Sequence, residues 1–226
     1  DTAANDEDPL TYKSLFWFHI PLAGTAVMVL LVQPLVTFSL ARLDRPTQSL
    51  AAWPVVFQIM LMARAAALAL PEAVIALTKG PDSYRPIRRF SLTLAAGVSV
   101  IVALFTFSPL AQLYLFGVQD MTAEVGALAQ GSLIYFLPFP ALTVIGMWLR
   151  GVLINGRKTT AVNIAMVVNM TVTVIVLAIG LAKQWAGLPT AAVALTLAVL
   201  AEIIYLAWRV QQILPTFSAK MATRGI

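Results

Sequence analysis

Long apolar runs separated by short polar connectors dominate this chain. Six such runs cover about residues 15–40, 50–77, 90–116, 125–149, 161–182 and 191–210. Each is close to the roughly 20 residues that an α-helix needs to cross the hydrocarbon core of a bilayer. Runs this long and continuous are helices, not the alternating strands of a membrane barrel. The pattern therefore predicts an all-α fold, a polytopic membrane bundle of about six transmembrane helices.

The predicted bundle occupies residues 14–213. Residues 1–13 are polar and acidic and are interpreted as a tail or an interdomain linker, and residues 214–226 as a basic C-terminal tail. The chain begins with Asp1 and no signal-peptide pattern follows. We therefore expect either a processed chain or the later part of a longer polypeptide.

Five prolines inside the first, second and fourth runs are expected to place bends there, because each removes a backbone hydrogen bond. Such bends in a membrane require neighbours that satisfy the freed backbone groups. They support a moving transporter only weakly, since channels and receptors also contain them. The prolines are Pro21, Pro34, Pro71, Pro138 and Pro140.

The composition agrees with a membrane protein, because 60% of the 226 residues are hydrophobic and only 11% are charged. A soluble domain carries about a quarter of charged residues. The chain has no cysteine and one histidine, which excludes disulfides, thiolate metal sites and multi-histidine sites. No metal or cofactor is predicted. Nor does any phosphate-binding glycine loop, zincin signature or G-x-S-x-G motif occur, so we do not expect an enzyme.

The net charge of +5 reflects membrane topology, not nucleic-acid binding, because the basic residues fall at the ends of apolar runs. One side of a six-span protein collects most of them, which predicts that both termini are cytoplasmic, in a bacterial inner (plasma) membrane. That side carries Lys79, Arg85, Arg88, Arg89, Arg150, Arg157, Lys158, Arg209, Lys220 and Arg224, whereas the opposite side mixes Arg42, Arg45 and Lys183 with Asp44, Asp120 and Glu124.

Two charged residues lie deep inside apolar runs, where a charge costs several kcal/mol unless it is paired or hydrated. Arg64 lies about 21 Å along the second run at 1.5 Å per residue. Glu202 lies at a similar depth in the sixth run. We hypothesise that they pair, and leave open whether the pair holds two helices together or handles a substrate.

Three further polar residues are candidates. Glu72 follows Pro71, and broken helices near ionisable groups recur at transporter binding sites. His19, near the cytoplasmic end of the first run, could lie level with Glu72, although the water interface is the better interpretation. Gln33 and Gln58 lie in the outer half of the first two runs, and Gln33 is equally compatible with a cavity and with an interhelical hydrogen bond. The candidate cavity residues are thus Gln33, Gln58, Arg64, Glu72 and Glu202.

In the fifth run, Asn163 and Asn169 are interpreted as helix-packing residues before ligand contacts.

Residues 137–159 carry a family resemblance. The stretch Leu-Pro-Phe-Pro ends in Arg150-Gly-Val-Leu, followed by Gly156-Arg157 and the next run. It resembles a recurring feature of the MATE-like flippase superfamily, in which a proline-containing span ends in an Arg-Gly-x-Leu turn. The opening Pro21-Leu-Ala with Gln33-Pro34 looks like the start of the second six-helix lobe of such proteins, as does the run containing Pro71-Glu72. From residue 136 onward the chain is most similar to the progressive ankylosis protein family.

The resemblance covers about residues 15–210 and implies one lobe of a transporter with two six-helix lobes and a central cavity. Six spans leave three possibilities: an isolated second lobe, a half-sized protein that pairs with itself, or a piece of a larger chain. The acidic lead-in resembles the linker between lobes and favours a lobe whose first half is missing. The coupling-ion residues of the first lobe would then be absent. The implied partners are the lipid bilayer, a small-molecule substrate, and a second lobe or homodimer partner.

Kinship with the ankylosis family implies export of a small organic or phosphorylated anion attracted by Arg64. Kinship with the wider superfamily alone allows a cationic drug or a lipid-linked sugar.

Two functions follow. A secondary exporter or flippase lobe working by alternating access predicts a polar, hydrated cavity lined by the first two runs, with Arg64 exposed to it. A non-transporting subunit that scaffolds a larger assembly with other membrane subunits predicts Arg64 and Glu202 buried against each other and no cavity. An enzyme acting on lipid lacks any supporting set of acids, bases or metal ligands.

Overall fold

The chain folds into a helical bundle. The computed structural model describes residues 27–28, 30–78 and 83–222, with only the backbone described for 213–222. Across these residues the secondary structure is helical and no strand forms, which confirms the all-α prediction. The expected acidic segment 1–13, the first half of the first run with His19 and Pro21, and Lys79 and Arg224 lie outside the described residues.

The helices follow one another with short connections. Their bounds are Leu30–Leu40 for the first helix, then α2 (Pro46–Ala63), α3 (Ala65–Leu68), α4 (Leu70–Leu77), α5 (Tyr84–Phe107), α6 (Pro109–Gln112), a π-helix (Leu113–Val118), α7 (Ala123–Leu133), a 3₁₀ turn (Ile134–Phe136), α8 (Pro138–Asn155), α9 (Thr159–Lys183) and α10 (Gly187–Ala222).

Four helices in the described part of the chain are long and apolar enough to cross a membrane. They are α5, α8, α9 and the Gly187–Gln212 part of α10, and they correspond to the third to sixth apolar runs of the sequence. The protein is therefore an integral membrane protein. The last helix continues to Ala222, so the backbone of residues 214–222 extends α10.

The second apolar run is not one helix but three. The backbone departs from helical geometry at Arg64 (φ −94°, ψ 1°) and bends again at Ala69 (φ −82°, ψ −11°). The sequence predicted an interruption at Pro71 and Glu72, whereas the second break lies just before it. A proline ring clashes with the carbonyl four residues earlier, which displaces the distortion toward Ala67 and Ala69.

Prolines also divide the next two runs. Ser108 precedes Pro109 and is extended (φ −97°, ψ 166°), as the steric clash with a following proline favours, so α5 ends at Phe107. The fourth run is divided by the 3₁₀ turn before Pro138. Its second part, α8, runs six residues past the predicted end at Leu149 and stops at Asn155.

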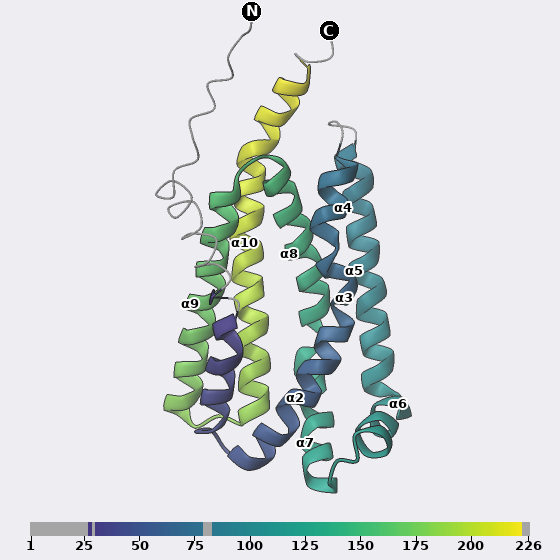
Figure 1. Cartoon of the computed structure of the whole chain (residues 1–226), viewed down its shortest axis with the longest axis vertical. Coiled ribbons are helices and arrows are strands. Elements are labelled where there is room, and N and C mark those ends of the chain that lie inside the picture. Colours follow the sequence, from purple (N-terminus) through teal and green to yellow (C-terminus); the bar gives the residue numbers. More distant parts are fainter. Residues whose placement is uncertain (1–26, 29, 79–82, 223–226) are drawn as a thin grey trace, which may run out of the picture.

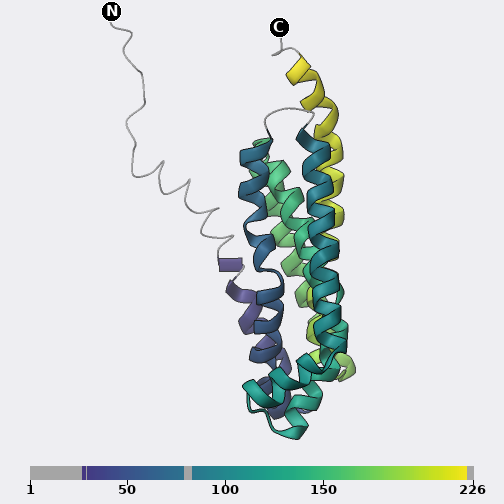
Figure 2. The same cartoon turned by 90° about the vertical axis from the view of Figure 1, so that its right-hand side faces the viewer.

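The chain runs down and up the bundle by turns: the first helix, α5 and α9 run one way, while α2–α4, α7–α8 and α10 run the other way, and α8 lies at the centre (Figure 1). It packs against α4, α5 and α10, while α9 covers another face of α10. Together α2, α3 and α4 run the length of the bundle (Figure 2). The α4 segment approaches α8 closely at Gly151, where a Cβ would lie 3.0 Å from the Cα of Pro71.

A polar contact ties the first helix to α2, because Trp53 Nε1 donates a hydrogen bond to Gln33 Oε1 at 3.1 Å. Helices α2 and α7 both lie toward the lower end in Figure 1. Gln48 of α2 donates a hydrogen bond to Glu124 of α7 at 3.1 Å. Lipid gives little hydrophobic driving force for one helix to pack against another, so such hydrogen bonds help to determine which helices are neighbours.

Candidate functional site

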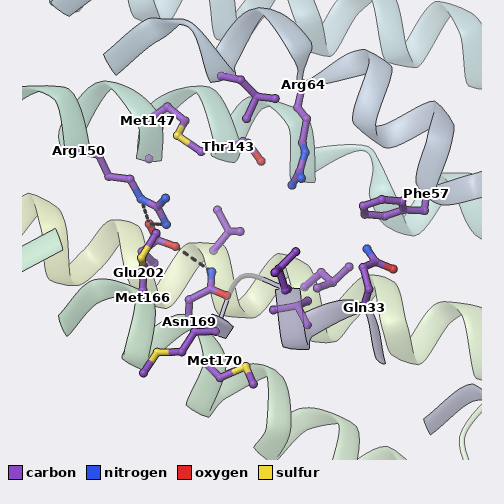
Figure 3. A pocket seen from close by; sticks show the side chains of 17 residues that line it. Gln33, Phe57, Arg64, Thr143, Met147, Arg150, Met166, Asn169, Met170 and Glu202 are labelled. Carbon is purple, nitrogen blue, oxygen red and sulfur yellow. Dashed lines mark hydrogen bonds and ion pairs between the residues drawn. The ribbon is translucent and has the colours of Figure 1, made fainter. Parts of the chain in front are cut away.

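A cavity of about 440 Å³ opens between the first helix, the α2–α3 break, α8, α9 and α10. Its size lies within the range of roughly 300–1,000 Å³ typical of small-molecule sites. Most of the wall is apolar, and the polar side chains come from five different segments (Figure 3). They are Gln33, Arg64, Thr143, Arg150, Asn169 and Glu202.

One wall carries a buried ion pair. Glu202 of α10 is 3% exposed, and its Oε1 accepts from Arg150 Nε at 2.6 Å and lies 2.5 Å from Arg150 Nη2. The other oxygen, Oε2, accepts from Asn169 Nδ2 at 2.8 Å. Both carboxylate oxygens are therefore occupied, and the group joins α8, α9 and α10 through a single side chain (Figure 3).

Arg64 lies across the cavity from this ion pair (Figure 3). Its Nε is buried and has no hydrogen-bond partner among the described residues. The guanidinium carbon lies 5.9 Å from the ring centroid of Phe57 and 5.8 Å from that of Phe139, near the outer limit of about 6 Å for a cation–π interaction. Two weak ring contacts replace only part of the hydration that a buried cation loses.

The predicted Arg64–Glu202 pair is wrong, since Glu202 pairs with Arg150. Equal depth in the membrane fixes the height of a residue along the bundle, but not the direction in which its side chain points. Helix α10 packs against α8, which places Arg150 beside Glu202, whereas Arg64 at the α2–α3 break lies across the cavity (Figure 3).

The other sequence candidates divide into two groups. Gln33 lines the cavity and also accepts a hydrogen bond from Trp53, so it has both the cavity position and the interhelical hydrogen bond that the sequence left open. Gln58 on α2 and Glu72 on α4 are exposed on the bundle surface and are not among the cavity-lining residues. The structure therefore brings together Gln33, Arg64 and Glu202 around one cavity and leaves Gln58 and Glu72 outside it.

The sequence did not predict that Arg150 pairs with Glu202, because the pattern places Arg150 in a basic connector after the fourth run. The apolar residues Val152, Leu153 and Ile154 follow it before the helix stops at Asn155 and Gly156. Asn155 and Gly156 form a typical helix end. If the helix is ended there and not at the charged Arg150, this residue lies inside α8. Asn169 was expected to serve helix packing, and its bond to Glu202 does join α9 to α10.

The cavity has an excess of positive charge. Arg150 and Glu202 neutralise each other by direct contact, which leaves Arg64 as a cation without a carboxylate partner in the described part of the chain. Inside a membrane, a cation in this position attracts an anion or water to complete its hydrogen bonds.

Comparison of the chain with protein-family models, with curated proteins and with solved structures gave no match.

Proposed function

We propose that this chain is a six-span lobe of a MATE-like secondary transporter that moves a small organic or phosphorylated anion by alternating access. The observation that carries the proposal is Arg64, a guanidinium that faces a cavity and lacks a hydrogen-bond partner at its Nε. Arginine binds carboxylates and phosphates through two parallel hydrogen bonds, so an anionic cargo would supply the partners that the protein does not.

The shape of the second apolar run also supports transport. Discontinuous helices near the membrane centre recur at the substrate sites of secondary transporters, and the α2–α3 break occurs at the cavity-lining Arg64 itself. The up-and-down order of the elements (Figure 1) is compatible with six crossings in which the first two contribute Gln33 and Arg64.

The scaffold alternative requires two features that the described residues lack. It predicted a cavity-free interior and mutual burial of Arg64 and Glu202, whereas Arg64 faces a cavity and Glu202 contacts Arg150. No specific contact in the described chain favours that alternative over transport.

The distribution of charge supports cytoplasmic termini in a bacterial inner membrane. The α8–α9 connector with Arg157 and Lys158, the start of α5 and the C-terminal end of α10 lie at one end of the bundle (Figure 1). The other end carries Arg42, Arg45 and Lys183 beside Asp44, Asp120 and Glu124. An excess of Lys and Arg on the cytoplasmic side is the general rule for membrane proteins.

A transport assay on Arg64 variants tests the proposal. The full chain, with every chain that co-purifies, is reconstituted in proteoliposomes and charge movement is recorded on a solid-supported membrane. Acetate, octanoate, octanedioate and inorganic phosphate are the test anions, and choline is the test cation. We expect at least one anion to give a saturable current that Arg64→Met weakens about tenfold to a hundredfold, the value of hydrogen bonds to a charged group.

Lys183→Met is the matched control, because it removes one exposed cation outside the cavity. It should leave the anion current unchanged. A current that is insensitive to Arg64→Met, or a current carried by choline alone, contradicts anion transport through this cavity.

The native mass of the solubilised particle shows how many copies of this chain and which other chains it contains, and this composition distinguishes a transporter from a scaffold. A dimer of this chain, or a covalent parent with twelve spans, supplies two lobes and supports transport. A single copy bound among unrelated membrane proteins supports the scaffold alternative. Native mass spectrometry with identification of each co-purifying chain makes this measurement.

A further inference from the structure

The wall of the cavity is chemically uneven. Four methionines from three segments line it, namely Met28, Met147, Met166 and Met170, and leucine, valine and phenylalanine side chains supply the other large apolar groups of the wall. Methionine is flexible and polarizable, and it adapts to apolar groups of different shape. Such a wall suits the hydrocarbon part of a ligand better than a strongly hydrated ion.

The charges of the cavity suit one anionic group and no more. Arg150 is engaged by Glu202 through Nε and Nη2, and Asn169 covers the other carboxylate oxygen. Arg64 is then the one cavity-lining cation without a carboxylate partner among the described residues. A second negative charge on a ligand would lie in an apolar environment without a counter-ion, which is strongly unfavourable.

The Arg64 guanidinium and the methionine side chains lie on different sides of the cavity. Figure 3 shows Arg64 on one side and Met147, Met166 and Met170 toward the other, beside the Arg150–Glu202 pair. A ligand whose charged group contacts Arg64 would place its remaining length along the methionines. Its apolar part would then lie near the Glu202 carboxylate without competing for it, because both oxygens of that carboxylate are already bonded.

Building on the proposed transport function, we propose that the cargo is an amphipathic monoanion. It has a single carboxylate, sulfonate or phosphodiester group bound by Arg64 and an apolar body bound by the methionine-rich wall. Polyanions and phosphate monoesters, which carry nearly two charges at neutral pH, are poor ligands for this cavity. The Arg64 guanidinium alone would accept any small organic or phosphorylated anion, and the apolar wall limits this class to monoanions with an apolar body.

The test measures binding by isothermal titration calorimetry to the full chain in phosphatidylcholine nanodiscs, with empty discs as the blank for partition into lipid. The ligands are octanoate, acetate, octanedioate, octylammonium and inorganic phosphate. Octanoate has one charge and a tail, acetate lacks the tail, octanedioate has a second charge and octylammonium has the opposite charge. We expect saturable octanoate binding at least tenfold tighter than that of each other ligand.

Three variants connect the binding to the cavity. Arg64→Met should weaken octanoate binding at least tenfold, and Arg64→Lys, which keeps the charge, should retain it within a few-fold. Lys183→Met should bind octanoate as the unmodified chain does. Gel-filtration profile and thermal unfolding show which variants are folded. If Arg64→Met does not fold, Arg64→Gln replaces it, because it also removes the charge; octanoate binding that is unchanged in Arg64→Gln counts against the proposal.

The outcomes separate this inference from the function on which it rests. If octanedioate or phosphate binds as tightly as octanoate and depends on Arg64, the amphipathic monoanion is overturned while anion transport stands. If no anion shows binding that depends on Arg64, or octylammonium binds best, both proposals are overturned.

Discussion

At the scale of single residues, Glu202 is the most constrained side chain of the site. It is 3% exposed and receives hydrogen bonds from Arg150 and Asn169. Removing one member of a buried ion pair leaves the other as an uncompensated charge, which is more harmful than removing both. The three residues therefore form one energetic unit that holds α8, α9 and α10 together beside the cavity.

A double-mutant cycle tests this unit. We expect Glu202→Met and Arg150→Met each to lower the free energy of unfolding by about 3–5 kcal/mol, and the double variant to lose less than either single variant. Unfolding by sodium dodecyl sulfate in mixed micelles, followed by circular dichroism, measures the three values. Additive losses would show that the two side chains do not interact in the folded protein.

The sequence indicates how deep a charged residue lies in the membrane better than it indicates which residue it pairs with. Arg64 and Glu202 were singled out because each lies far inside an apolar run, and both line the cavity. Their partners depend on how each helix is rotated about its axis and on which neighbours it meets. For that reason Arg150, at the predicted edge of the membrane, was missed as the partner of Glu202.

At the scale of elements, the approach of α4 to α8 explains how a broken segment stays in place. Gly151 of α8 has no side chain, and a Cβ built there would lie 2.8 Å from Val74 Cβ and 3.0 Å from Pro71 Cα. The α4 backbone can pack at this distance only against a glycine. Because Gly151 follows Arg150 directly, this contact also fixes the height of the arginine that pairs with Glu202.

Two glycine-to-alanine variants test the close approach. Gly151→Ala should destabilise the protein by about 1–3 kcal/mol because the methyl group overpacks the α4–α8 contact. Gly97→Ala on α5 is the matched control, since a Cβ there meets no atom within 4 Å, and it should be neutral or stabilising by up to about 1 kcal/mol. Thermal unfolding in detergent compares the two, and equal shifts would refute a specific contact at Gly151.

Element boundaries were set by prolines and by the Asn-Gly helix end more than by hydropathy. The apolar runs correctly marked where helices occur, but α2, α3 and α4 divide a run that reads as continuous. A proline changes the backbone without changing the hydropathy of the run. The break at Arg64 has no proline within the four residues that follow it, so neither the apolar pattern nor a proline predicts its position.

At the scale of the whole molecule, the up-and-down arrangement assigns each connector to an end of the bundle. The α8–α9 connector lies at the end opposite to the α9–α10 connector (Figure 1), as expected if α9 crosses the membrane. Basic residues concentrate at the first of these two ends.

Single cysteines test this topology, because the chain contains no native cysteine that would react in the background. In intact bacterial cells, a membrane-impermeant maleimide should label Lys183→Cys but should label Lys158→Cys only after permeabilisation. Both positions are exposed in the structure. Labelling of both from outside would mean that α9 does not cross, whereas the reversed pattern would mean that α9 crosses in the opposite orientation.

The sequence by itself determined that this protein resides in a membrane, that it is helical, and which charges lie deep. These properties follow from local composition, since hydrocarbon accepts only segments whose backbone bonds are satisfied internally and whose side chains are apolar. Tertiary structure alone decided that Glu202 pairs with Arg150, that Arg64 faces a cavity, and that Gln58 and Glu72 do not. Those outcomes depend on helix rotation, proline breaks and close packing between segments far apart in the chain, and a linear pattern of hydrophobic residues encodes none of them.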